Sequence, residues 1–271
     1  VCSSNLYNHV ADEYLVVWED YRRTGDWSDS DIYGQFIGGD GVLKGVNVPV
    51  CSTSSSQYWP VLAYDSRMDR YLIVFQDYRN GNDGDIYGLF FGSNGEVQPV
   101  DSSEADGAFP ISKNPGSVYI PAVSYNYNQG IFLAVWQENR DGTPDIYGQR
   151  IAFNGELLPA PGASDSKENF PVDNNVDFDE GVPDVGYNPV TDEWFVVYAR
   201  KVEHNNSSIL GRRLDYEGNI VNDQGESIGG APADTPPITI SELTGNNPDG
   251  AQVRVQFNTE PGIDLDRKSV V

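Results

Sequence analysis

Positively charged residues are scarce in this chain of 271 residues: 17 Lys and Arg stand against 41 Asp and Glu, and the formal net charge is −24. Phosphate backbones and anionic lipid surfaces repel such a chain. The composition therefore argues against nucleic acid and anionic membranes as partners and favours a cation or a neutral ligand. A solvated acidic surface with no bound ion explains the same charge equally well.

Long apolar runs are also missing. No stretch approaches the roughly 18 apolar residues that cross a bilayer, so we expect no membrane insertion. Histidine occurs only at His9 and His204, which argues against a His-based catalytic triad or a His-rich metal centre. The sequence contains no serine-nucleophile motif, phosphate-binding loop or dinucleotide fingerprint.

Cysteine occurs twice, at Cys2 and Cys51, in matching Val-Cys-Ser contexts one repeat apart. The two thiols could form a disulfide, which implies an oxidising compartment. Alternatively, both could be small buried side chains in equivalent positions, or Cys2 could carry a lipid.

Instead of these features, the chain contains four copies of one pattern, with a period of roughly 60 residues. Each copy has an apolar strand, and these strands are Tyr14–Trp18, Tyr71–Phe75, Phe132–Trp136 and Trp194–Tyr198. A polar loop separates it from a second motif, at Asp31–Ile37, Asp85–Phe91, Asp145–Ile151 and, in a worn form, Ser208–Leu214. A unit of this length cannot bury its own apolar face, so the units must stack on one another.

Two further segments complete each unit. A proline-led strand precedes the apolar one, at Pro60–Asp65, Pro121–Asn126 and Pro183–Asn188, and a variable segment with prolines closes the unit as an edge strand. Four short antiparallel strands without helical periodicity predict an all-β fold, a β-propeller of four-stranded antiparallel blades. We expect one domain over 1–271, with repeats at about 6–59, 60–120, 121–182 and 183–250 and a partial unit at 251–271. Five blades are favoured, with Val1–Ser4 closing the ring as an outer strand, and four is the alternative.

The repeats resemble a family of β-propeller blades common in secreted bacterial and archaeal proteins, which share the elements YLVVW, D-x-R, DIYGQ and a later glycine. The resemblance covers about Leu6 to Leu243. It implies the propeller fold and a secreted or cell-surface protein, but it says little about function.

An acidic residue precedes an arginine by two positions after each of the first three apolar strands, at Asp20 and Arg22, Asp77 and Arg79, and Glu138 and Arg140. We expect the arginine to pair with this acid and with the motif aspartate across the hairpin, such as Asp85 for Arg79, and so to clamp the loop. The fourth repeat lacks both the arginine and the motif aspartate, as expected for partners.

The same loops are rich in carboxylates and amides, which are the ligands that Ca²⁺ prefers. The candidate ligands are Asp26, Asp29, Asp31, Asn82, Asp83, Asp85, Asp141 and Asp145. Their spacing is not that of an EF-hand, but we expect that Ca²⁺ could stabilise these loops.

Aromatic residues should share the face of the molecule where these loops emerge. Trp27 lies in the first loop, and Tyr58, Trp59 and Tyr119 directly precede the strand-leading prolines. Aromatic rings beside carboxylates and amides are typical of sugar-binding surfaces. The competing interpretation is that Tyr58 and Trp59 pack between adjacent blades.

The sequence-based prediction is a secreted, non-enzymatic propeller that acts as a binding or scaffold module for carbohydrate or for a partner protein at the cell surface. The alternative is a glycoside hydrolase or lyase that uses carboxylates in the central cleft. Asp65, Asp184 and Glu193 can be nominated for that role. They occupy repeat-equivalent or turn positions, whereas a catalytic residue is expected to break the repeat.

Overall fold

The computed structural model describes residues 3–23, 25, 29–81, 83–113, 116–140, 142–163, 169–203, 206–222 and 238–239. Several predictions fall on other residues and lie outside this part: those for Cys2, Asp26, Trp27, Asn82, Asp141 and the partial repeat at 251–271.

The described residues form four antiparallel sheets of four strands each. The first contains β1 (Ser3–Asn8), β2 (Glu13–Asp20), β3 (Asp31–Gly38) and β4 (Leu43–Cys51). The second contains β5 (Gln57–Asp65), β6 (Arg70–Asp77), β7 (Asp85–Gly92) and β8 (Phe109–Ser112). The third contains β9 (Ser117–Asn126), β10 (Ile131–Asn139), β11 (Asp145–Ala152) and β12 (Phe170–Asp173), and the fourth contains β13 (Asp179–Asn188), β14 (Glu193–Glu203), β15 (Asn206–Asp215) and β16 (Ile238–Thr239).

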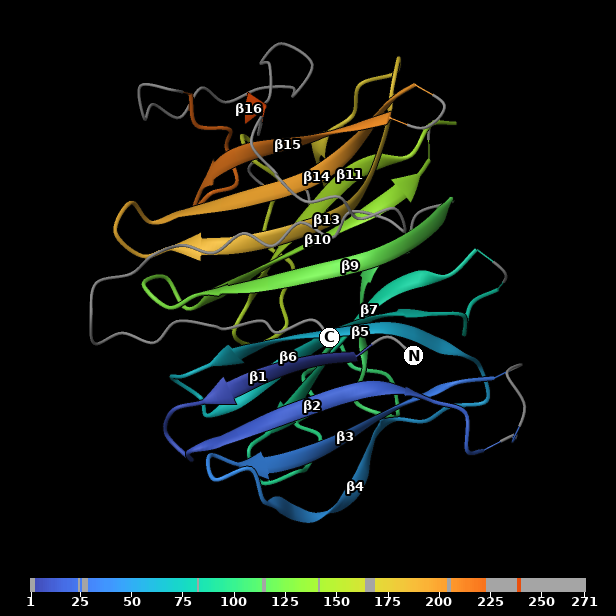
Figure 1. Ribbon diagram of the computed structural model, residues 1–271, viewed down its shortest axis with the longest axis vertical. Helices are drawn as coiled ribbons and strands as arrows, with labels where there is room; N and C mark the ends of the chain where they lie inside the picture. The colour runs from blue at the N-terminus through green and yellow to red at the C-terminus, as the bar shows by residue number, and fades with distance from the viewer. Residues whose placement is uncertain are drawn as a thin grey trace.

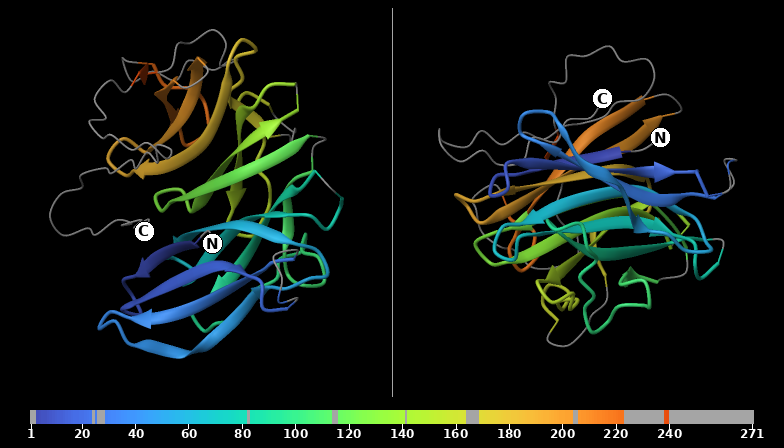
Figure 2. Two further views of the ribbon diagram at one scale, coloured as in Figure 1. Left: turned by 45° about the vertical axis from the view of Figure 1, so that its right-hand side comes forward. Right: turned by 90° about the horizontal axis from the view of Figure 1, so that it is seen from below.

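The sheets follow one another in chain order, from β1–β4 at the bottom of Figure 1 to the fourth sheet at the top, and they fan out as successive blades in Figure 2. Within each sheet the strands are also in chain order, and the first strands of successive sheets contact one another. The prediction of an all-β propeller with four-stranded antiparallel blades is confirmed. Within the described residues, no helix is long and apolar enough to cross a membrane.

The two-sided apolar strands place the core between the blades. In β6, Tyr71, Ile73 and Phe75 pack toward the first blade, whereas Leu72 and Val74 pack toward the third. All five side chains are fully buried. Because successive side chains of a strand point to opposite faces, a strand between two blades must be apolar at every position.

The N-terminal residues correct one prediction. Ser3 and Ser4 belong to the innermost strand β1, where they pair with Trp18 and Val17 of β2. They therefore do not form an outer strand that closes a fifth blade, because β1 continues an unbroken antiparallel register with β2 up to Asn8. Cys51, at the end of β4, is buried and its thiol is free.

The acid–arginine pairs form as expected in the first three blades, with distances of 2.5 Å for Asp20–Arg22, 2.7 Å for Asp77–Arg79 and 2.6 Å for Glu138–Arg140. Each guanidinium also stacks on the tyrosine of the DIYG motif, 4.1, 4.4 and 3.6 Å from the ring centroids of Tyr33, Tyr87 and Tyr147.

The expected partnership of Arg79 with Asp85 is wrong. Arg79 pairs with Asp77 and with Asp106 at 2.8 Å, while Asp85 accepts a hydrogen bond from Asn80 at 2.7 Å. In the fourth repeat, Val202 replaces the arginine and Leu210 replaces the tyrosine. The arginine is therefore absent from the same repeat as the ring on which it stacks in the other three.

We expect Arg79→Ala to destabilise the protein by about 3 kcal/mol, because it leaves the fully buried Asp77 carboxylate without its cation. Urea denaturation of the single and double variants measures the coupling. Arg79 should couple strongly to Asp77 and negligibly to Asp85, and the reverse order would contradict the assignment.

Candidate functional site

Each described innermost strand from the second blade on contains a bulge just before its proline. The register with the next strand shifts between Tyr58 and Val61 in β5, and equivalent shifts occur in β9 and β13. The residues before the prolines, Trp59, Ile120 and Val182, have positive φ angles of 51°, 52° and 53°. This conformation is rare for residues other than glycine. A bulge re-aims side chains out of the strand alternation, so the repeat provides fixed, outward-turned positions at this end of the blades.

A side chain from the preceding blade holds the bulge in place. Glu19, at the end of β2, accepts a hydrogen bond from the backbone N–H of Trp59 at 2.8 Å. Gln76 occupies the equivalent position in the second blade and donates to the carbonyl of Val118. Glu19 is thus an acid where the next two blades carry Gln76 and Gln137. Glu19 therefore breaks the repeat. The change from glutamine to glutamate is visible in the sequence, but the sequence-based prediction missed it.

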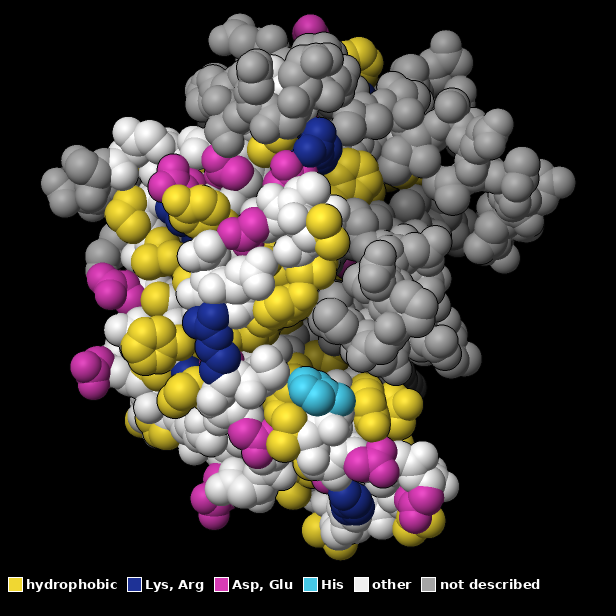
Figure 3. Space-filling model, turned by 90° about the vertical axis from the view of Figure 1, so that its left-hand side faces the viewer, with side chains coloured by type: hydrophobic (Ala, Val, Ile, Leu, Met, Phe, Trp, Pro, Cys, Tyr) yellow, Lys and Arg dark blue, Asp and Glu magenta, His cyan; other side chains and the backbone are white. Residues whose placement is uncertain are grey.

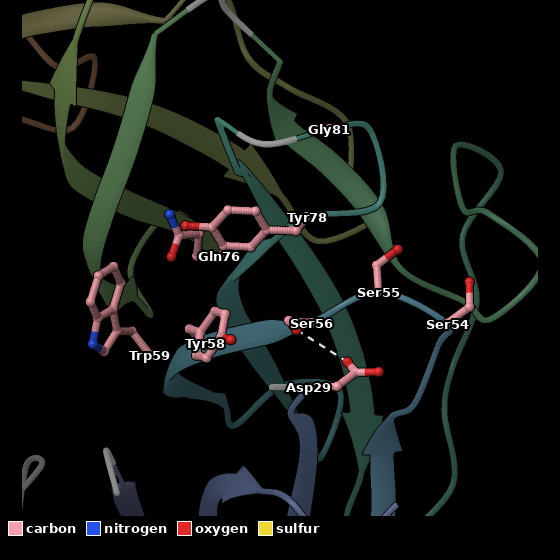
Figure 4. A pocket seen from close by; sticks show the side chains of 9 residues that line it. All are labelled: Asp29, Ser54, Ser55, Ser56, Tyr58, Trp59, Gln76, Tyr78 and Gly81. Atoms are coloured by element: carbon pink, nitrogen blue, oxygen red, sulfur yellow. Dashed lines mark hydrogen bonds between the residues drawn. The ribbon is translucent and has the colours of Figure 1, made fainter. Parts of the chain in front are cut away.

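A cleft opens between the first and second blades beside the bulge, with a volume of about 730 Å³ (Figure 4). Its lining comes from the loop before β3, the connection from β4 to β5, the strands β5 and β6, and the loop after β6. The lining residues are Asp29, Ser54, Ser55, Ser56, Tyr58, Trp59, Gln76, Tyr78 and Gly81.

Two of the four residues predicted to bind a ligand, Tyr58 and Trp59, line this cleft, and Tyr119 lies beside it. The ring of Trp59 meets that of Tyr119 edge-on at 5.7 Å, and Tyr58 meets Tyr78 at 5.6 Å with an interplanar angle of 90°. Tyr58, Trp59 and Tyr119 are half-buried, so each ring packs on its neighbours and still presents surface to the cleft.

Among the described residues, Asp29 contributes a carboxyl group to the lining of the cleft, and the Glu19 carboxyl is bonded to the backbone of a lining residue, Trp59. Asp29 pairs with Arg23 at 2.7 Å and accepts a hydrogen bond from the Ser56 hydroxyl at 3.1 Å. Glu19 is 6 % exposed, and besides the Trp59 backbone N–H its carboxylate accepts a hydrogen bond from the Tyr21 hydroxyl at 3.1 Å. Burial, reinforced by the neighbouring Glu19 charge, raises the pKa of Tyr21 to about 12, so this phenol remains a proton donor at neutral pH.

The predicted calcium ligands are dispersed. Asp31 is buried and pairs with Arg23 at 3.1 Å, Asp85 and Asp145 are buried at the starts of their strands, and Asp83 is exposed. Among the described residues, no three or more His, Cys, Asp or Glu side chains group as a metal site would require. Calcium binding stays a prediction.

The three acids nominated for catalysis have structural contacts. Asp65 is fully buried and accepts a hydrogen bond from the Tyr125 hydroxyl of the next blade at 2.6 Å. Glu193 pairs with Arg213 at 2.8 Å, and Asp184 accepts a hydrogen bond from the backbone N–H of Val185.

A second group of charged residues breaks the repeat, between the third and fourth blades. We call it the ionic cluster, and it consists of Asp173, Glu180, Tyr198, Arg200 and Arg212. Asp173 accepts hydrogen bonds from Tyr198, from Arg200 at 2.9 Å and from Arg212 at 3.3 Å, and Arg200 also donates to Glu180 at 2.7 Å. Burial, with the Asp173 charge as the second cause, raises the pKa of Glu180 to about 8.

No protein-family model matches the chain, and no curated protein matches its sequence. Solved structures do resemble it. One is an N-acetylgalactosamine deacetylase from F. plautii in complex with blood group B trisaccharide, with 11% identity and a TM-score of 0.48 over 76% of this chain and 63% of that one. Another is an α-L-arabinofuranosidase from Lactobacillus brevis, with 10% identity and a TM-score of 0.45 over 83% of this chain and 71% of that one.

A third is a family 43 glycoside hydrolase from Bacillus licheniformis, with 11% identity and a TM-score of 0.47 over 85% of this chain and 57% of that one. The chain thus spans less than two thirds of the length of the deacetylase and of the family 43 hydrolase. At these identities the similarities say nothing about the substrate of this chain.

The prediction of a non-enzymatic binding or scaffold module is corrected: the three solved structures described above are a deacetylase, an arabinofuranosidase and a glycoside hydrolase, and none of them is a non-enzymatic module. At 10–11% identity they show the fold of this chain and not its activity. The prediction rested on the apparent lack of an acid that breaks the repeat. Glu19 is such an acid, and its carboxylate holds the backbone of Trp59, which lines the cleft.

Proposed function

We propose that the chain is a glycoside hydrolase and that the cleft between the first two blades is its active site. The observation that carries the proposal is the cleft itself, whose lining combines the aromatic residues Tyr58, Trp59 and Tyr78 with the carboxylate of Asp29. The Glu19 carboxylate accepts a hydrogen bond from the backbone N–H of Trp59. Aromatic rings provide flat apolar surface for the C–H faces of a sugar, and the serine and glutamine side chains provide partners for its hydroxyls.

The proposed chemistry needs two carboxyl groups that hold one proton between them, which Asp29 and Glu19 would provide. One donates its proton to the glycosidic oxygen as the bond from that oxygen to the anomeric carbon breaks. The other accepts a proton from the water whose oxygen bonds to the anomeric carbon. The products are two free sugars, and the proton returns to the first carboxyl through solvent.

The charges favour a neutral substrate and a hydrolase over a lyase. No Lys or Arg is among the described residues that line the cleft, and the nearby Arg23 pairs with Asp29 and Asp31. A lyase that removes a proton beside a sugar carboxylate needs positive charge to stabilise the resulting anion. The described lining of this cleft supplies none.

We expect Glu19→Gln and Asp29→Asn each to lower the rate of glycoside hydrolysis by about 10²–10⁴-fold, the usual contribution of a positioned acid or base. The rate is measured as aryl-glycoside cleavage and reducing-sugar release over a panel of neutral glycosides. Glu19→Gln installs the residue that Gln76 and Gln137 provide in the next blades, so the melting temperature should change little.

The exposed Asp101 is the matched control, and Asp101→Asn should leave the rate unchanged. Hydrolysis that persists at the wild-type rate in both cleft variants would show that these carboxyls are not catalytic. A wild-type protein that cleaves none of the glycosides would contradict the proposed function.

We propose separately that the protein is exported and that calcium stabilises its acidic loops. Asp29 and Asp31 share one cation, Arg23, and a bound ion would relieve the remaining repulsion. Millimolar Ca²⁺ should raise the melting temperature more than sodium chloride of equal ionic strength, and Asp29→Asn with Asp31→Asn should reduce the difference. Identical melting curves in the two salts would exclude calcium stabilisation.

A further inference from the structure

The aromatic surface does not end at the cleft. Tyr58 and Trp59 of β5 and Tyr119 and Ile120 of β9 occupy equivalent positions before their prolines, and we call these four residues the rim strip. The Trp59 and Tyr119 rings are in contact, with centroids 5.7 Å apart, so the strip passes from the second blade to the third without a break. In the fourth blade Gly181 replaces the tyrosine, so the aromatic part of the strip ends with the third blade.

The backbone holds the strip rigidly. Trp59 and Ile120 share the left-handed bulge conformation, with φ angles of 51° and 52°, and each precedes a proline whose ring fixes its own φ. Glu19 ties the Trp59 bulge to the first blade, and Gln76 ties Val118, next to the second bulge, to the second blade. A surface ordered before binding loses little conformational entropy when a ligand arrives.

The charges identify the occupant. The rim strip is uncharged, and the described lining of the adjoining cleft consists of aromatic, serine and glutamine side chains, Gly81 and one acid, Asp29. With a net charge of −24 on the chain, an anionic glycan would be repelled. A neutral sugar chain matches both the apolar rings and the hydroxyl and amide groups between them.

We infer that the rim strip extends the cleft into a binding surface for a neutral oligosaccharide longer than a disaccharide. This inference rests on the proposed function. Sugar units at the cleft contact Tyr58 and Trp59, and the units beyond them lie on Tyr119 and Ile120. Tyr119 is therefore a residue that determines the preferred length of the substrate.

The test measures binding by calorimetry in the Glu19→Gln background, where turnover is suppressed. The probes are xylo-, manno-, cello- and malto-oligosaccharides of increasing length from the disaccharide. Tyr119→Ala should weaken binding of the longest oligosaccharides by about tenfold, or about 1.4 kcal/mol, and leave disaccharide binding unchanged. Trp59→Ala should weaken binding at every length.

Tyr216→Ala is the matched control. Tyr216 is 41% exposed and directly follows β15, at the end of the blade away from the cleft. Figure 3 shows one side of the molecule, where apolar side chains lie among polar and charged ones. This variant should bind every probe like its parent. An oligogalacturonate should bind at least about tenfold more weakly than the best neutral oligosaccharide of its length, a difference of about 1.4 kcal/mol.

A loss of binding affinity in Tyr119→Ala that appears only for the longer oligosaccharides supports the inference even if no hydrolysis is found. The binding surface and the hydrolase proposal can therefore fail separately. The inference would be overturned if Tyr119→Ala lost the same affinity at all lengths or lost none at any length. It would also be overturned if the oligogalacturonate bound as tightly as the neutral oligosaccharides. Failure of every neutral probe to bind would overturn it as well.

Discussion

Replacing Asp173 by serine, the residue that the preceding blade carries as Ser112, should destabilise the protein by about 3–5 kcal/mol, the usual cost of removing one partner from a buried ion pair. Asp173 is 1 % exposed and accepts hydrogen bonds from two arginines, Arg200 and Arg212. Without its carboxylate, the two positive charges remain in the interface between the third and fourth blades with Glu180 as the acid paired with Arg200.

The matched comparison is a double variant in which two positions receive the residues of the preceding blade. Arg212 stands where the third blade has Gln149, so Asp173→Ser with Arg212→Gln removes one charge of each sign and copies the preceding blade. We expect this double variant to lose less stability than the two single changes added together. Urea denaturation measures all three variants, with the exposed Asp177→Asn as control. Strict additivity would show that the two side chains do not act as a pair.

Stability should also fall as the pH rises through the range in which Glu180 is ionised only in the unfolded chain. Burial raises the pKa of Glu180 from 4.5 to about 8, against the opposing effect of its hydrogen bond from Arg200. The Arg200 guanidinium is shared with Asp173, so it does not fully offset the burial.

The sign follows from proton binding. Below about pH 4.5 Glu180 is protonated in both states and contributes no pH dependence. Between this pH and about 8 the unfolded chain releases the proton and the folded protein retains it, so folding becomes less favourable as the pH rises. Each pKa unit corresponds to about 1.4 kcal/mol, and the loss is on the order of a few kcal/mol.

Glu180→Gln should remove this dependence, because a neutral amide binds no proton in either state. Relative to the wild type, the free energy of unfolding of this variant should therefore rise between pH 5 and pH 8. Denaturation at several pH values measures the difference, with the exposed Glu96→Gln as control. A difference that stays constant across the range would contradict a raised pKa for Glu180.

Local pattern was sufficient to predict the blades. The apolar strands Tyr71–Phe75 and their equivalents must be buried on both faces, and the turns between them carry glycine, aspartate and asparagine. These are properties of residues close together in the chain, so four-stranded antiparallel units follow from them. The same local reasoning placed Tyr58, Trp59 and Tyr119 at one end of the innermost strands, where the structure finds the cleft and the rim strip.

Contacts between residues that are distant in the sequence were decided only by the tertiary structure. Arg79 meets Asp77, two positions away, as its sequence motif indicates, but its second partner Asp106 lies 27 positions along the chain and no motif marks it. Asp85, which the motif offered as the partner, is held by Asn80 instead.

Glu19 shows the same limit, because its carboxylate holds the backbone of Trp59, 40 positions along the chain, across a blade boundary. Sequence comparison among the repeats could show that Glu19 differs from Gln76 and Gln137. The stacking of one blade on the next was needed to bring that acid to the backbone of a residue that lines the cleft, since the burial, charge and hydrogen bonds of a side chain depend on neighbours that are distant in sequence.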